Sequence, residues 1–221
     1  MILEGKIIDF LGDSITEGVG VTDRANNRFD KRMERECNLK ATYNYGIGGT
    51  RLAHQIKVSA EKPRWDLCFC GRAYDLNKDA DVIVVFGGTN DYGHGDAPFG
   101  SLEDTTPATY CGAVYWLMNF LKTTYPNAQV VFMTPAHRKG DGVKSGNAKK
   151  APDAQPLVEY VKAMEVQGEK LGVPVLNLFE NLPIDPNDPE QKEKYTIDGL
   201  HFNDDGHAII AEQLIKFLKA L

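Results

Sequence analysis

The chain has 221 residues, 42% of them hydrophobic, which suffices to bury one core and fits a single α/β domain over residues 1–221. Its formal net charge of −6 argues against the concentrated positive field that a nucleic acid or an anionic membrane requires of its partner. No apolar run approaches the roughly 18 residues of a membrane-spanning helix, so we expect neither partner.

The start of the chain and its cysteines bear on the cellular compartment. Residues 1–6 lead directly into the first predicted strand without a basic and then apolar leader, which favours a cytoplasmic protein. A leader removed beforehand would leave a similar start and make the protein secreted. The four cysteines lack zinc-ribbon spacing and are predicted to be free thiols, as in a reducing compartment: Cys37, Cys68, Cys70 and Cys111. The sequence does not indicate an oligomeric state.

The first third of the chain predicts two strands. Residues 7–12 form a short apolar strand that stops at Gly12-Asp13-Ser14. A helix is predicted over residues 27–39, because Phe29, Met33 and Cys37 recur every four residues, with Asn26 or Asn27 as its N-cap. Residues 41–45 form the second strand, followed by a glycine-rich loop. A further helix is predicted over residues 51–59, and an irregular segment over 61–78.

The clearest strand is the continuous β-branched run of residues 81–86, which is typical of a central strand covered on both faces. A broken segment follows over residues 92–106, and then a helix over 110–122 that starts at Thr105 or Thr106 with Pro107. Residues 129–133 form the fourth strand. Residues 136–152 are predicted to be a solvated loop, with a binding lid as the alternative.

A helix over residues 155–171 ends at Gly172, and residues 173–178 form the fifth strand. After a proline-rich stretch, a helix over 205–221 closes the chain with an apolar face made of Ile209, Ile210, Leu214, Phe217 and Leu218. Strands that alternate with helices predict a parallel sheet with right-handed crossovers. We therefore predict a three-layer α/β/α, flavodoxin-like sandwich with strand order 2-1-3-4-5.

Four short motifs follow predicted strands or lie in the last loop: Gly12-Asp13-Ser14, Gly46-Ile47-Gly48-Gly49, Gly87-Gly88-Thr89-Asn90-Asp91 and Asp198-Gly199-Leu200-His201. Open α/β sheets place their chemistry at the carboxyl ends of their strands. Together and in this order, the motifs resemble those of the SGNH (GDSL-like) hydrolases, a family of serine esterases and acylhydrolases. The chain has Ile15 after the serine where many members have leucine, a conservative change.

The resemblance and the chemistry of the residues agree on the catalytic roles. A serine hydroxyl needs an imidazole to take its proton, and the imidazole needs a carboxylate to orient it. Ser14, His201 and Asp198 suit these roles, because a spacing of three in a turn brings the last two to one side. The donors available for the oxyanion, as the resemblance also implies, are the amides of Ser14 and Gly49, with Gly48 as the alternative in another loop register, and the side chain of Asn90.

Each of these residues could also have a purely structural role. Ser14 could cap a helix, Asn90 could be a turn residue, and His201 could be a satisfied semi-buried group. We expect a structural role for Asp13, and a packing or surface position for His207. We take the following as candidates for substrate binding: Asp13, Arg51, His54, Asp91, His94 and His137.

Two other classes of function stay open at this point. The side chains of Asp13, Asp91, Asp96, His94 and His201 could form the metal cluster of a phosphoesterase, although no pair has tight helical ligand spacing. A non-catalytic flavodoxin-like binding module is the other, but Gly18-Val19-Gly20 lacks the third glycine of a dinucleotide motif. The preferred interpretation needs no metal and no cofactor.

The substrate is the least determined point. The long polar segments 92–106, 136–152 and 181–197 favour a polar ester over a buried fatty chain. We predict a small-molecule or oligosaccharide ester as the partner, with a short acyl group such as acetyl on a sugar. A lysophospholipid or an acyl thioester is the alternative.

Overall fold

A computed structural model describes residues 1–144 and 152–221 of the protein. Its centre is a parallel sheet of five strands in the order β2-β1-β3-β4-β5, as predicted. The strands are β1 (Ile7–Gly12), β2 (Ala41–Gly46), β3 (Val82–Phe86), β4 (Gln129–Met133) and β5 (Val175–Leu176). The predicted central position of β3 is confirmed, and the predicted fifth strand is reduced to two residues, because Asn177 already caps a new helix at Leu178.

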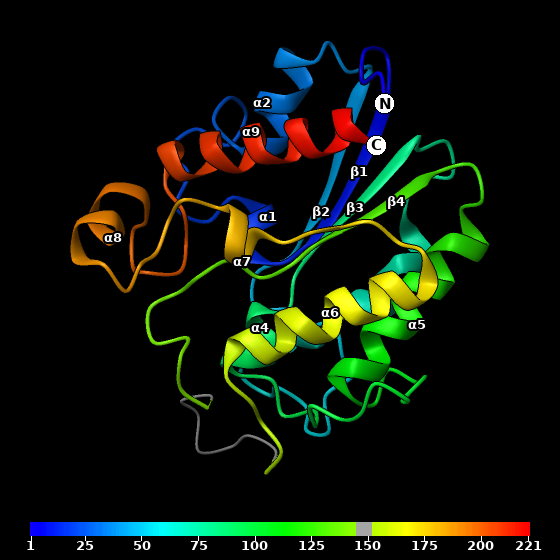
Figure 1. Ribbon diagram of the computed structural model, residues 1–221, viewed down its shortest axis with the longest axis vertical. Helices are drawn as coiled ribbons and strands as arrows, with labels where there is room; N and C mark the ends of the chain where they lie inside the picture. The colour runs from blue at the N-terminus through cyan, green and yellow to red at the C-terminus, as the bar shows by residue number, and fades with distance from the viewer. Residues whose placement is uncertain (145–151) are drawn as a thin grey trace.

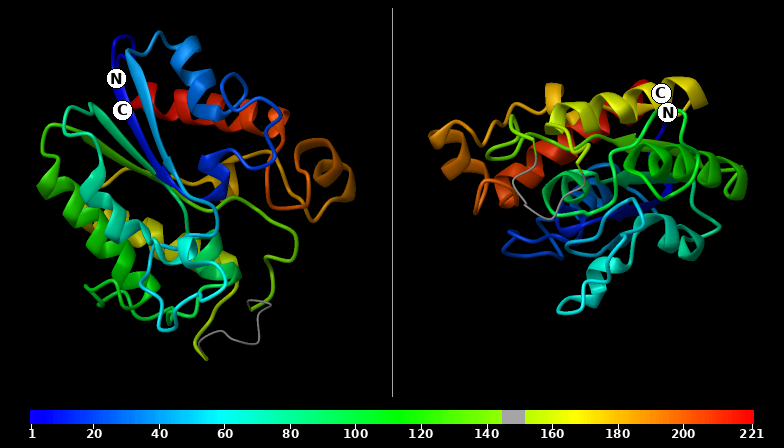
Figure 2. Two further views of the ribbon diagram at one scale, coloured as in Figure 1. Left: turned by 180° about the vertical axis from the view of Figure 1, so that it is seen from behind. Right: turned by 90° about the horizontal axis from the view of Figure 1, so that it is seen from below.

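Helices cover both faces of the sheet (Figures 1 and 2). Helices α2 and α9 lie against one face, while α3, α5 and α6 lie against the other. The helices of the described residues are α1 (Ser14–Glu17), α2 (Phe29–Glu36), α3 (Phe69–Arg72), α4 (Thr89–Gly93), α5 (Tyr110–Thr124), α6 (Leu157–Leu171), α7 (Leu178–Asn181), α8 (Pro189–Tyr195) and α9 (Asp204–Ala220), with short 3-10 turns at Pro63–Asp66 and Ala73–Asp75.

Alternate residues of the central strands enter two separate cores. On β3, Val82, Val84 and Phe86 pack with α2 and α9, whereas Ile83 and Val85 pack with α3, α5 and α6. Side chains alternate across a strand, so a strand covered on both sides must be apolar at every position. This explains why the unbroken apolar run was the clearest strand signal in the sequence.

The parallel register aligns the carboxyl ends of the strands. Gly12 of β1 pairs with Gly46 of β2 and with Phe86 of β3. The motifs that follow these strands therefore emerge at one edge of the sheet, where α1 and α4 begin (Figure 1).

Two predicted helix starts are wrong. Helix α2 begins after Arg28, because Asn26 and Asn27 belong to a preceding turn held by Asp23. Helix α5 begins after Thr109, whose hydroxyl accepts the Gly112 amide at 3.1 Å, and not at Thr105 or Thr106. At α5 a local side-chain hydrogen bond decides the boundary, whereas α2 begins without a side-chain cap.

The predicted helix over residues 51–59 is also wrong. The Asp91 carboxylate accepts the amides of Leu52 and Ala53 at 2.9 and 3.0 Å, and the Asp96 carboxylate accepts those of Ile56 and Lys57 at 2.9 Å. These acceptors lie some forty residues away in the chain and hold the segment in an irregular path. Five helices of the described residues, each of seven residues or fewer, were not predicted: α1, α3, α4, α7 and α8.

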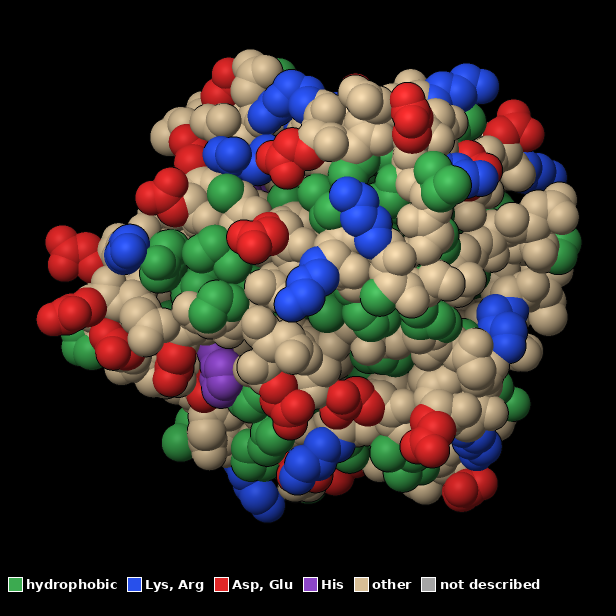
Figure 3. Space-filling model, turned by 45° about the horizontal axis from the view of Figure 1, so that its top comes forward, with side chains coloured by type: hydrophobic (Ala, Val, Ile, Leu, Met, Phe, Trp, Pro, Cys, Tyr) green, Lys and Arg blue, Asp and Glu red, His purple; other side chains and the backbone are tan. Residues whose placement is uncertain are grey.

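The remaining predictions concern cysteines, the 136–152 segment and membranes. All four cysteines are free and buried. Residues 145–151 of the predicted loop lie outside the described residues, so the choice between loop and lid stays a prediction. Within the described residues, no helix has the length and apolar character needed to cross a bilayer. The face shown in Figure 3 carries basic and acidic side chains interspersed.

Candidate active site

Ser14 is placed by the end of β1 and the start of α1. Asp13 caps this helix, because its Oδ1 accepts the Ile15 amide at 2.9 Å. The serine is 6% exposed and follows the strand without an intervening loop. As the first residue of α1, its backbone N–H has no acceptor within the helix. The hydroxyl and the amide are thus presented together at the sheet edge.

The loop between α8 and α9 brings Asp198 and His201 to this serine. The Nε2 of His201 lies 3.0 Å from the Ser14 Oγ, and its Nδ1 lies 2.6 Å from Asp198 Oδ2. The other carboxylate oxygen accepts the amides of Leu200 and His201 at 2.9 and 2.8 Å. The three-residue spacing therefore works through a tight turn closed by the aspartate itself.

Hydrogen bonds hold this turn in its shape and keep its carboxyl group charged. Partial burial would raise the pKa of the Asp198 carboxyl, but hydrogen bonds from the His201 and Leu200 amides and from the imidazole lower it overall. The carboxylate thus stays ionised beside the imidazole. The turn is fixed further where Ile197 donates to the His201 carbonyl at 2.9 Å and Lys139 donates to the Gly199 carbonyl at 2.8 Å.

The two glycines that were alternatives as oxyanion donors differ in this structure. The Gly48 amide donates to Glu17 Oε2 at 2.6 Å. The Gly49 amide has no acceptor among residues 1–144 and 152–221. Gly49 has φ +79°, a conformation that favours glycine, and a Cβ there would overlap the Trp65 indole. The geometry favours Gly49 over Gly48 as the available donor.

Asn90 lies in the first turn of α4. Its side-chain Nδ2 donates to the Thr50 carbonyl at 3.0 Å, and its Oδ1 is 3.1 Å from His94 Nε2. A carboxamide nitrogen carries two hydrogens, so one remains for a ligand. The contacts with Thr50 and His94 fix the plane of the amide.

Glu17 is a site residue that the sequence reasoning missed. Besides the Gly48 amide, its carboxylate accepts Arg64 Nη2 at 3.1 Å. It therefore ties the helix that starts with Ser14 to the loop that carries Gly49. The signal in the sequence was its position one helical turn after Ser14, which places it beside the loop after the neighbouring strand.

Several candidate substrate-binding residues hold the site together from within. Burial raises the pKa of Asp13 to about 6, although the Ile15 amide and His201 lower it in part. Asp91 is buried and occupied by the backbone amides described above. Asp13, Asp91 and Asp96, three members of the imagined metal cluster, each accept backbone N–H groups. No three His, Cys, Asp or Glu side chains of the described residues gather as ligands for a metal.

Arg51 and His94 line a cavity of about 460 Å³, together with other residues of segment 51–66 and Asp96. Arg51 Nη1 is 3.1 Å from His94 Nδ1, and Arg51 Nη2 donates to Asp66 at 3.0 Å. Trp65 also lines the cavity, with its ring 4.6 Å from that of His94. Sequence reasoning did not propose Trp65 as a site residue, because it lies in the segment 61–78 that was predicted only to be irregular.

The other histidines lie elsewhere. His54 is exposed and its amide donates to the Pro107 carbonyl, whereas His137 bonds Asp141 at 2.7 Å and packs on Phe179. Within the part of the chain that the structure describes, neither one lines the cavity. His207 is buried and stacks on Phe29, the packing role that the sequence allowed.

Comparisons with known proteins agree with this geometry. A family model described as the GDSL-like Lipase/Acylhydrolase family matches residues 10–209. A solved structure from Lactobacillus plantarum is 29% identical with a TM-score of 0.82, and the match covers 98% of each chain. A comparison with curated proteins gave no match.

Two structures of esterases share the fold at lower identity. An acetyl xylan esterase is 20% identical with a TM-score of 0.62, covering 95% of this chain and 98% of its own. A two-domain esterase active on acetylated mannans is 19% identical with a TM-score of 0.62, covering 99% of this chain and 50% of its own. Such parallel-sheet hydrolases share the layered fold described above.

Proposed function

Because the chain belongs to the GDSL-like lipase/acylhydrolase family and is a carboxylic ester hydrolase, we propose that it removes short acyl groups, acetyl above all, from a polar substrate such as a carbohydrate. The observation that carries the proposal is the hydrogen-bonded row from Asp198 through His201 to Ser14, with distances of 2.6 and 3.0 Å. The reaction proceeds through an acyl-serine intermediate.

In the acylation step, the Ser14 Oγ attacks the ester carbonyl carbon while His201 Nε2 takes the hydroxyl proton. Asp198 stabilises the imidazolium that forms. The carbonyl oxygen becomes an oxyanion and receives hydrogen bonds from the amides of Ser14 and Gly49 and from Asn90 Nδ2. The tetrahedral intermediate then expels the alcohol, which takes its proton from His201.

In the deacylation step, water replaces the alcohol. His201 takes a proton from the water as it attacks the acyl-serine carbonyl, and the same donors hold the second oxyanion. Collapse of this intermediate breaks the bond to Ser14 Oγ, which recovers its proton from His201. The acid is released and the resting hydrogen bonds are restored.

Three observations support a short acyl group on a polar alcohol. The oxyanion donors Gly49 and Asn90 are closely backed by Trp65 and His94, respectively, which leaves little room beside them. Most of the residues that line the cavity behind these side chains are charged or polar, and Val58 and Ala60 add apolar surface to it. Of two esterases with the same fold, one is active on acetylated mannans and the other is an acetyl xylan esterase.

The test combines a nucleophile variant with a substrate series. Ser14→Ala should abolish hydrolysis of nitrophenyl acetate while circular dichroism stays unchanged, and Ser101→Ala, in an exposed loop, is the matched control. Nitrophenyl esters of increasing acyl length are compared with acetylated oligosaccharides, whose released acetate is measured. A maximum at eight or more acyl carbons, without acetate release from sugars, would reject the proposal in favour of a lipid or thioester substrate.

A further inference from the structure

The cavity described above is separated from the catalytic serine by two side chains. Trp65 and His94 both line the cavity, and each also adjoins an oxyanion donor: Trp65 packs against Gly49, and His94 bonds Asn90. The residues that line the cavity include neither Ser14 nor the two donors. We call Trp65 and His94 the wall.

Contacts with each other and with Asn90 and Arg51 hold the side chains of the wall in place. The Trp65 and His94 rings lie 4.6 Å apart, and His94 is held between Asn90 Oδ1 and Arg51 Nη1, both at 3.1 Å. Arg51 is 2% exposed and is itself bonded to Asp66, the residue after Trp65. A ligand that had to displace a side chain held by these contacts would bind with a less favourable free energy.

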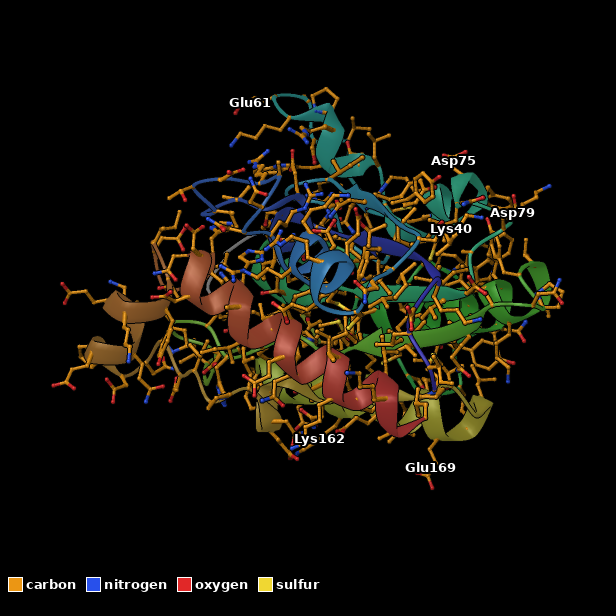
Figure 4. The ribbon with its side chains drawn as sticks, turned by 90° about the horizontal axis from the view of Figure 1, so that it is seen from above. Lys40, Glu61, Asp75, Asp79, Lys162 and Glu169 are labelled. Atoms are coloured by element: carbon orange, nitrogen blue, oxygen red, sulfur yellow. The ribbon has the colours of Figure 1, made fainter. Side chains whose placement is uncertain are left out.

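The chemistry decides which part of the substrate meets the wall. The leaving alcohol must receive its proton from His201 Nε2, so it faces the loop that precedes α9. The acyl chain occupies the remaining direction at the tetrahedral carbon. Segment 51–66, marked by Glu61 at its tip, projects from a different edge of the molecule than α8 and the loop to His201 (Figures 2 and 4). The wall adjoins the oxyanion donors, away from the leaving alcohol, and we take this to be the acyl side of the site.

The cavity behind the wall is large enough to hold an acyl chain. A volume of about 460 Å³ lies within the range of small-molecule pockets. Apolar side chains of Val58 and Ala60 contribute to its lining. An acyl chain of several carbons would gain apolar contacts there if the indole did not stand in its way.

We propose that the wall sets the acyl-length limit of the enzyme, with Trp65 as the specificity-determining residue that keeps longer acyl chains out of the cavity. The inference rests on the proposed function and deepens it, because it names the side chain that selects short acyl groups. Removing the indole joins the cavity to the space above Gly49 and lets a longer chain enter.

Trp65→Ala is assayed with nitrophenyl acetate, butyrate and hexanoate. The ratio of kcat/KM for hexanoate to that for acetate should rise at least about tenfold relative to the parent, as expected when a pocket accepts added methylenes. Trp65→Phe should give a smaller rise. The matched control is Trp116→Ala, which removes the second of the two tryptophans from a surface stack with Phe120; its ratio should stay unchanged.

An unchanged ratio in Trp65→Ala, or an equal rise in Trp116→Ala, would overturn the inference while leaving the esterase proposal intact. Failure of the esterase proposal has a different signature, since the parent would then hydrolyse none of the esters or Ser14→Ala would remain active. If Trp65→Ala fails to fold, Trp116→Phe leaves Trp65 as the sole tryptophan. Its fluorescence should change when a hexyl phosphonate labels Ser14, and no change would contradict contact with the chain.

Discussion

Replacement of Glu17 by Gln tests whether this carboxylate positions the oxyanion loop. The Gly48 amide donates to Glu17 at 2.6 Å, and a Cβ on Gly48 would lie 3.5 Å from the Ser14 Cβ, so the glycine loop passes directly over the nucleophile. The Glu17 side chain is 23% exposed, which leaves the bond largely shielded from solvent. Because Gly48 precedes Gly49, the bond fixes the direction of the neighbouring amide.

The expected cost follows from the kind of hydrogen bond that is lost. A hydrogen bond to a charged group contributes about 1.5–3 kcal/mol and a neutral one about 0.5–1.5 kcal/mol. Glu17→Gln should therefore lose about 1–1.5 kcal/mol of positioning energy, which corresponds to roughly a tenfold fall in kcat. Glu17→Ala leaves the Gly48 amide without this acceptor, and its kcat should fall by on the order of 100-fold, as when an oxyanion donor is removed.

The assay is steady-state hydrolysis of nitrophenyl acetate, with kcat and KM measured separately. KM should change little, because the loop acts on the oxyanion and not on the neutral ester. Arg64→Gln is the control: it removes only the ion pair with Glu17, whose arginine side is 56% exposed, and should stay within about twofold of the parent. Near-parental kcat in both Glu17 variants would refute the positioning role.

Two further predictions concern charge. Asp198→Asn should lower kcat less than His201→Ala, because the carboxylate orients the imidazole without taking the proton; equal activity of Asp198→Asn and the parent would show that another group orients His201. Burial raises the pKa of Asp9 from 3.8 to about 6. The protonated carboxyl therefore stabilises the folded state at low pH, and the free energy of unfolding should fall by up to about 3 kcal/mol as the pH rises from about 4 to about 6. Urea unfolding of Asp9→Asn should lack this decrease, and a pH dependence like that of the parent would contradict it.

The strands and the catalytic motifs could be predicted because their signals are local. The unbroken apolar run of residues 82–86 is typical of a strand that is buried on both faces, as observed. Ser14 and the Asp198–His201 pair stand out because polar residues end an apolar strand or sit in a tight turn. Their mutual distances still required the structure.

The path of segment 51–66 could not be predicted for the opposite reason. Its backbone amides bond Asp91 and Asp96, which are distant in the chain, and no local pattern reports such partners. The same holds for Trp65, whose position against Gly49 follows from that path. The predicted start of α5 failed because the capping bond of Thr109 outweighed the propensity of nearby residues, whereas α2 begins after Arg28 without a side-chain cap.

The sequence by itself predicted the strands and the candidate nucleophile with its partners, because hydrophobic periodicity and short motifs depend on residues that are neighbours in the chain. The tertiary structure alone decided which glycine amide is left for a ligand, which carboxylate holds the glycine loop, and what lies behind the oxyanion donors. These features are contacts between segments far apart in sequence, and their energies arise only when parallel strands bring the segments to one edge of the sheet.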